Sequence, residues 1–186
     1  MYKIAISGGP NAGKTTLWQA LQAEFPEAHF VPEPATTFLE DQERQQKDNP
    51  HHELCAPWID YTKFGPAVTA LSLKLEADIP PETRLTFLDR SLVDTVAYSR
   101  LNNFERFIPI VEPHLQAARY TMGIICQPVG SYTETNIRRE TPEEALQTHR
   151  QLQQAYNETG MPVLTLPAFS VADRVAVIRD VVANLP

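Results

Sequence analysis

The sequence predicts a single α/β domain over residues 1–186, with a parallel β-sheet flanked by helices. Short runs of β-branched and aromatic residues alternate with longer segments whose apolar residues recur every three or four positions, as strands alternating with helices do. The short runs lack a strict apolar–polar alternation, which is typical of parallel strands buried on both faces. A length of 186 residues suits one domain with its own hydrophobic core.

Five segments have the composition of buried strands. They are Tyr2–Ser7, His29–Pro32, Arg84–Asp89, Tyr120–Cys126 and Pro162–Leu166. We expect a helix from near Gly13, because Leu17 and Leu21 follow it four residues apart.

Three later helices begin with capping signals. Thr141 opens the segment TPEE, which predicts an N-cap, a proline at N1 and a capping box for a helix that runs to about Asn157. Ser91 and Ser170 open segments of the same form, each with an aspartate three residues later. The final helix should pack an apolar stripe against the sheet, made of Val171, Val175, Ile178 and Val182.

A long insertion, at about residues 41–80, separates the second strand from the third. From Leu54 onward its apolar residues recur at steps of three and four, which predicts an amphipathic helix kinked or broken at Gly65 and Pro66. Its aromatic side chains are expected to join the core, with a pocket lining as the alternative. These aromatic residues are Trp58, Tyr61 and Phe64.

Composition excludes several classes of protein. A formal net charge of −7 and the lack of a basic run argue against a general DNA- or RNA-binding protein. Two distant cysteines and five histidines without metal spacing predict neither a disulfide framework nor a zinc site. No apolar run is long enough to span a membrane or to act as a secretion signal, so we expect a cytoplasmic protein.

Residues 8–15 read GGPNAGKT and match the P-loop pattern G-x-x-x-x-G-K-[ST], between a predicted strand and a predicted helix. In such a loop, backbone N–H groups and the helix N-terminus bind phosphate oxygens. Lys14 should reach the β- and γ-phosphates of ATP, and the Thr15 hydroxyl should bind Mg²⁺. The residues expected to bind the nucleotide are Gly8, Asn11, Ala12, Gly13, Lys14, Thr15 and Thr16.

The rest of the chain narrows the class of P-loop protein. An Asn-Lys-x-Asp guanine reader is missing, and the third strand ends in Asp89-Arg90-Ser91 rather than in the Asp-Glu of a motor ATPase. An arginine at that position suits the binding of a phosphoryl group or substrate better than the activation of water.

Three segments resemble the P-loop nucleoside and nucleotide kinases, closest to AAA-labelled kinase-like ATPases that include nicotinamide riboside kinase domains. Val31-Pro32-Glu33-Pro34 is similar to the Glu-Pro motif of deoxynucleoside kinases, and Asp89-Arg90-Ser91 to their Glu-Arg-Ser motif and to the Asp-Arg of thymidylate kinases. Arg138-Arg139-Glu140 stands where that family has an arginine-bearing lid, here about residues 130–141. The resemblance implies a three-layer P-loop sandwich with strand order 2-3-1-4-5, and adenine near Ala168 and Phe169.

Residue roles follow from phosphoryl-transfer chemistry. Glu33 should serve either as the base for an attacking hydroxyl or as a holder of hydrated Mg²⁺, unless it is a surface acid. Asp89 should bind Mg²⁺ through water, with a salt bridge as its alternative, and Arg90 should bind phosphate oxygens. For Asp94 two interpretations stay open: an acid of the active site, or a residue that caps the helix beginning after Ser91. Arg138 and Arg139 should stabilise the transferring charge when the lid closes, with stacking of Arg138 on adenine as an alternative. A solvated helix start is the other interpretation for one of the two arginines.

These residues predict an enzyme that transfers the γ-phosphoryl group of Mg·ATP to a small-molecule acceptor, a nucleoside or a nucleotide. The acceptor should lie between Glu33, Arg90 and the aromatic insertion. The alternative is a non-kinase module in which ATP binding or slow hydrolysis controls a partner. The oligomeric state stays open, with a homodimer as one arrangement.

Overall fold

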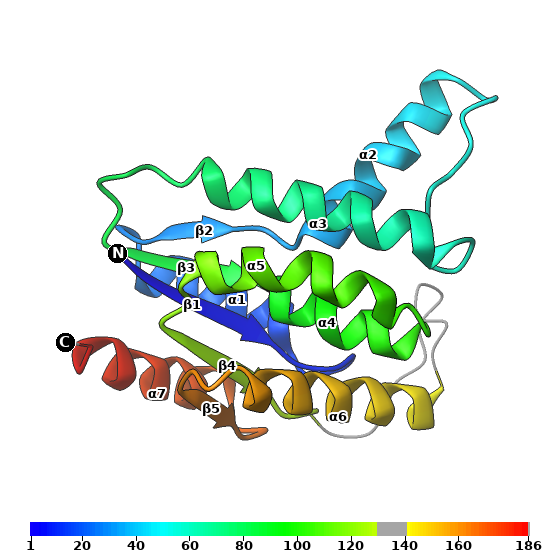
Figure 1. The fold of residues 1–186 in the computed structure, drawn as a ribbon. Coiled ribbons are helices and arrows are strands. Elements are labelled where there is room, and N and C mark those ends of the chain that lie inside the picture. Colours follow the sequence, from blue (N-terminus) through cyan, green and yellow to red (C-terminus); the bar gives the residue numbers. More distant parts are fainter. Residues whose placement is uncertain (130–140, 186) are drawn as a thin grey trace.

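The computed structural model describes residues 1–129 and 141–185 and contains one five-stranded parallel sheet. Its strand order, β2-β3-β1-β4-β5, confirms the predicted order (Figure 1). The strands are β1 (Tyr2–Ser7), β2 (His29–Val31), β3 (Leu85–Asp89), β4 (Met122–Cys126) and β5 (Val163–Leu166). β1 has its predicted bounds, and the other four are one or two residues shorter than predicted.

Helices cover both faces of the sheet, as predicted. On one face, α1 (Lys14–Glu24) and α7 (Val171–Ala183) pack on β1 and β4 in a core that contains Ile4, Leu17 and Ile178. On the other face, three helices pack on the sheet around a second core that contains Ala5, Val96 and Tyr156. These are α4 (Leu92–Leu101), α5 (Ile108–Ala118, after the 3₁₀ turn Glu105–Phe107) and α6 (Pro142–Glu158). Ile4 and Ala5 therefore face opposite layers, as neighbours on a strand must.

The predicted helix starts are confirmed. Thr141 and Glu144 form a reciprocal capping box at the start of α6, and Ser91 and Asp94 form another at the start of α4. The Ser170 hydroxyl accepts a hydrogen bond from the Asp173 N–H at the start of α7. Each side chain satisfies a backbone donor that the first helical turn leaves unpaired.

The insertion between β2 and β3 contains two helices, α2 (Pro34–Asp48) and α3 (Tyr61–Ala77). Helical structure already begins at Pro34, and α2 projects away from the body of the molecule (Figure 1). The predicted break at Gly65 and Pro66 is wrong, because α3 continues through both residues. Pro66 lies near the start of α3, where its ring removes one backbone bond, while the Thr69 hydroxyl donates to the Gly65 carbonyl (2.8 Å) in the next turn.

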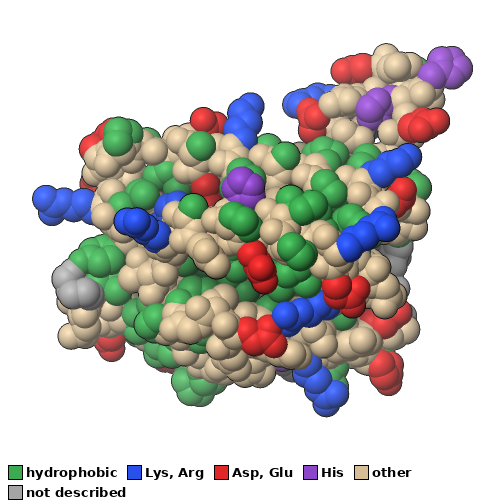
Figure 2. Space-filling view, in the orientation of Figure 1, with side chains coloured by type: hydrophobic (Ala, Val, Ile, Leu, Met, Phe, Trp, Pro, Cys, Tyr) green, Lys and Arg blue, Asp and Glu red, His purple; other side chains and the backbone are tan. Residues whose placement is uncertain are grey.

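Across the described ranges, no helix is both long and apolar enough to cross a membrane. On the face shown in Figure 2, acidic and basic side chains are interspersed rather than gathered into a basic stripe. The predicted lid at about residues 130–141, with Arg138 and Arg139, lies almost wholly outside the described residues, so this part of the domain organisation stays a prediction.

Candidate active site

The glycine-rich segment forms a tight loop between β1 and α1. Gly8 has a φ of 144°, and a Cβ atom there would lie 2.6 Å from the Cys126 carbonyl oxygen, so a side chain cannot be accommodated. Asn11 and Gly13 also have positive φ values, 61° and 68°. Gly13 is the N-cap of α1, which places the positive end of that helix dipole at the loop.

Hydrogen bonds within the loop and to the segment after β4 hold the loop in this shape. The Val129 N–H donates to the Asn11 carbonyl (2.9 Å), and the Asn11 amide donates back to the Val129 carbonyl (3.2 Å). The Lys14 ammonium donates to the carbonyls of Gly8 (2.9 Å) and Gly9 (3.2 Å) across the loop. The P-loop predicted from sequence is therefore a backbone cradle with its lysine folded over it.

Lys14 lies beside the residues at the ends of β2 and β3. Burial, and then the charge of Arg90, lower its pKa to about 8, against the opposing effect of Glu33 and Asp89. The loop is thus electrostatically coupled, through Lys14, to the carboxylates of Glu33 and Asp89, both predicted from the sequence to belong to the site. A phosphate group bound there would return full charge to the ammonium.

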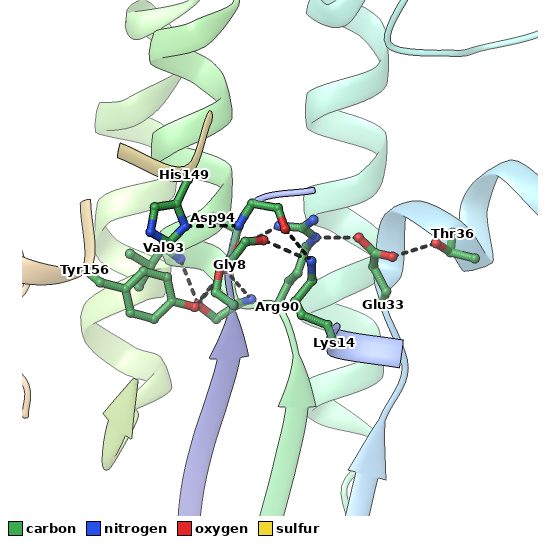
Figure 3. A network of polar contacts seen from close by, with 12 residues as sticks. Gly8, Lys14, Glu33, Thr36, Arg90, Val93, Asp94, His149 and Tyr156 are labelled. Carbon is green, nitrogen blue, oxygen red and sulfur yellow. Dashed lines mark hydrogen bonds and ion pairs between the residues drawn. The ribbon is translucent and has the colours of Figure 1, made fainter. Parts of the chain in front are cut away.

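Glu33 lies two residues after the end of β2 and is the N-cap of α2, between two prolines. Its carboxylate pairs with the Arg90 Nε and accepts a hydrogen bond from the Thr36 hydroxyl (2.6 Å) (Figure 3). Burial alone would raise the pKa of Glu33, but Arg90, the Thr36 hydrogen bond and Lys14 lower it to about 2. Glu33 is therefore an ionised, oriented carboxylate at neutral pH.

Arg90 occupies a strained backbone position directly after β3. Its φ is 70°, and its N–H donates to the Ile6 carbonyl (2.9 Å), so the strand ladder continues into the turn. Its guanidinium pairs with Glu33 and with Asp94 (3.0 Å), and lies 5.3 Å from the centre of the Tyr98 ring. The structure thus places Arg90 between two carboxylates, and these contacts fix its orientation.

Asp94 joins more elements than any other side chain of this network. It is 3% exposed and accepts hydrogen bonds from the Ser91 N–H (3.0 Å) and the hydroxyls of Ser7 (2.5 Å) and Tyr156 (2.7 Å) (Figure 3). With Arg90, these contacts connect β1, the β3–α4 turn and α6. Sequence spacing reveals only its capping role, because Ser7 and Tyr156 are far away along the chain.

Asp89 and Thr15 are the predicted magnesium ligands. Asp89 ends β3, and among the described residues its buried Oδ1 has no hydrogen-bond partner. Burial, and then the charge of Glu33, raise the pKa of Asp89 to about 6, although Arg90 and Lys14 oppose the rise. An unpartnered carboxylate oxygen beside the cradle fits a hydrated cation. The described part of the chain has no cluster of three acidic, histidine or cysteine ligands, but Mg²⁺ bound to nucleotides uses few protein ligands.

A cavity of about 1010 Å³ opens beside Glu33 and Arg90, between α2, α3 and α4. The aromatic residues singled out from the sequence, Trp58, Tyr61 and Phe64, line it, so the pocket alternative for these side chains is confirmed. Tyr61 and Phe64 also contact other aromatic rings of the interior, whereas Trp58 is 53% exposed.

Sequence reasoning missed two buried residues that contact the cradle. His149 of α6 faces the loop, and a Cβ atom at Gly9 would lie 2.9 Å from the His149 Cβ. Burial, and then Lys14, lower the pKa of His149, which favours the neutral ring. Arg174 of α7 donates to the Ala12 carbonyl (2.7 Å). No local motif marks either residue.

Comparison with known proteins agrees with this geometry. A family model described as an AAA domain matches residues 3–174. The structure of deoxyadenosine kinase from M. mycoides, solved with dCMP and dCDP bound, matches with a TM-score of 0.71 at 14% identity, over 98% of this chain and 100% of that one. Thymidylate kinase from Ehrlichia chaffeensis matches with a TM-score of 0.65 at 13% identity, over 97% and 98%. No curated protein matches the sequence. The likeness to the two kinases establishes the shared fold.

Proposed function

The chain belongs to the AAA domain family, and we propose that it is a kinase that transfers the γ-phosphoryl group of Mg·ATP to a hydroxyl group of a small, non-phosphorylated acceptor of the nucleoside class. One observation carries the proposal. The P-loop lysine and the large cavity both adjoin the Glu33–Arg90 pair, an arrangement that would give a phosphate donor and a ring-shaped acceptor neighbouring sites.

The chain's own residues supply the positioning and charge that phosphoryl transfer requires. Lys14 and the loop N–H groups would bind the β- and γ-phosphates. Thr15 and Asp89 would hold Mg²⁺, which when bound neutralises phosphate charge. Arg138 and Arg139 would add positive charge from the lid, and adenine would lie near Ala168 and Phe169.

Glu33 would accept a hydrogen bond from the attacking hydroxyl. A pKa of about 2 makes it a weak base toward a free hydroxyl, so its contribution is mainly to orient the nucleophile. Its proton affinity becomes sufficient only as the hydroxyl oxygen bonds to phosphorus and its proton becomes acidic. Arg90 and Thr36 hold the carboxylate in place for this step.

The charges around the cavity favour an acceptor without a phosphate group. Among the described residues that line it, four are acidic and one, Arg90, is basic. Two of the acids, Glu33 and Asp94, already pair with Arg90. The other two acids are Glu43 and Glu144. A nucleoside brings a flat ring for the aromatic lining and hydroxyls for Glu33, whereas a nucleotide would bring a second anion.

Acceptor-dependent ADP release tests the proposal. With ATP and Mg²⁺, we expect nucleosides to accelerate ADP release in the wild type, nucleoside monophosphates to do so far less, and Lys14→Met to abolish the effect. Lys74→Met, an exposed lysine on α3, is the matched control and should behave as the wild type. Equal ADP release with and without every acceptor would favour the non-kinase module instead.

A further inference from the structure

A fully buried arginine lies behind the phosphate cradle and contacts three backbone segments that surround it. Arg174, in the first turn of α7, is 1% exposed. Its Nη1 donates to the Ala12 carbonyl of the P-loop (2.7 Å), its Nη2 to the Gln127 carbonyl after β4 (3.0 Å), and its Nε to the Pro167 carbonyl after β5 (2.9 Å).

The partners of this guanidinium are unusual for so buried a cation. All three are neutral carbonyls, and within the described residues Arg174 has no carboxylate in ion-pair contact. Removing a charge from water is costly unless an opposite charge compensates it. The polyphosphate that the proposed function assigns to the adjoining loop would supply this opposite charge.

The contact with Ala12 reaches the phosphate site through a single peptide group. The Ala12 carbonyl and the Gly13 N–H belong to the same peptide, and Gly13 is the N-cap of α1. A cation bound to that carbonyl fixes the plane of the peptide and withdraws electron density from it, which makes the Gly13 N–H a stronger donor.

We propose that Arg174 is a positioning residue for the polyphosphate of the bound nucleotide, acting through the Ala12–Gly13 peptide. Its bonds to Gln127 and Pro167 hold the ends of β4 and β5 in register with the loop, so the phosphate and base sides of the nucleotide site move together. This inference rests on the nucleotide site of the proposed function, but not on the identity of the acceptor or on transfer itself.

Calorimetric titration with ADP and with inorganic tripolyphosphate tests the role without any acceptor. We expect Arg174→Met to weaken both ligands about tenfold or more, and Arg174→Lys to recover part of the loss because it keeps the charge. In turnover, the KM for ATP should rise while the KM for the acceptor stays constant. The matched control is Arg179→Met, an exposed arginine of the same helix that pairs with Glu24 and should bind both ligands normally.

If Arg174 only stabilised the fold, its substitutions would lower the melting temperature of the protein without changing the affinities for ADP and tripolyphosphate. Dissociation constants of Arg174→Met within twofold of the wild type, in a folded protein, would therefore overturn the proposal. Where Arg174→Met does not fold, Arg174→Lys decides, and an unchanged dissociation constant for both ligands overturns it. A wild type that binds polyphosphate but phosphorylates no acceptor would refute the kinase and leave this inference standing. A wild type that binds neither ligand would refute both.

Discussion

Arg90, in the turn between β3 and α4, and Asp94, in the first turn of α4, form a buried ion pair 3.0 Å long. The same guanidinium pairs with Glu33, the N-cap of α2, and the same carboxylate accepts a hydrogen bond from Tyr156 of α6. The carboxylate proposed to orient the acceptor is therefore fixed, through Arg90 and Asp94, by the core on one face of the sheet. These contacts connect the hydrophobic core to the residues of the candidate active site.

Asp94→Asn should destabilise the fold strongly, because it removes the charge that compensates Arg90 in a buried site. We expect a loss of about 3–5 kcal/mol in the free energy of unfolding, measured by urea denaturation. Asp173→Asn is the matched control, since Asp173 is also the third residue of a capped helix but is exposed, and it should cost about 1 kcal/mol or less. Equal losses in the two variants would reduce Asp94 to a capping residue.

Asp89→Asn should stabilise the protein at neutral pH and weaken magnesium-dependent nucleotide binding. Because folding raises the pKa of Asp89 to about 6, the stability that comes with its protonated form is lost as the pH rises through 6. The variant should therefore gain about 1–2 kcal/mol at pH 7 and little at pH 4. Urea denaturation at the two pH values, with magnesium titrations in the presence of ADP, measures both effects. An Asp89→Asn variant that is less stable than the wild type at pH 7 would show that the ionised Asp89 stabilises the fold, contrary to this prediction.

Nucleotide binding should take up a proton above neutral pH. The pKa of Lys14 is about 8 in the free protein, and a bound phosphate should raise it again. The dissociation constant for ADP should therefore increase by up to about tenfold for each pH unit above 8. Calorimetry in buffers of different ionisation enthalpy should detect the proton, and Lys14→Met should abolish the uptake. The same uptake in Lys14→Met would assign the proton to another group.

Glu33→Gln should leave ATP affinity nearly unchanged and lower turnover by about 10²- to 10⁴-fold. The amide keeps the size of the side chain but loses the charge that pairs with Arg90 and accepts the hydroxyl proton. Since the pKa of Glu33 is about 2, its titration should not appear in the wild-type rate between pH 5 and 8. Single-turnover rates and ATP titrations separate the two effects. Unchanged turnover would remove Glu33 from the mechanism.

The local parts of this site could be predicted from the sequence. Residues 8–15 are contiguous, so the loop, its lysine and its flanking strand and helix all leave a signal within one short segment. Helix caps are equally local, and the predicted boxes at Ser91 and Thr141 are present. The strand order followed from the resemblance to P-loop kinases.

The long-range contacts could not be predicted. Asp94 and Tyr156 are 62 residues apart in the chain, and Ala12 and Arg174 are 162 apart, so no spacing rule connects them. The break predicted at Pro66 is wrong because the local sequence does not report the tertiary packing of the helix. Tertiary packing of α3 outweighs a local propensity when the proline removes only one bond near the helix start.

The fate of the γ-phosphoryl group decides whether the protein is a kinase. ATP labelled at that group should be incubated with Mg²⁺ and the best nucleoside of the panel, and the label followed into products. We expect the label to move to a hydroxyl of the nucleoside in the wild type and to stay on ATP in Lys14→Met. Label released only as inorganic phosphate, or never released with any nucleoside, would contradict phosphoryl transfer to a nucleoside.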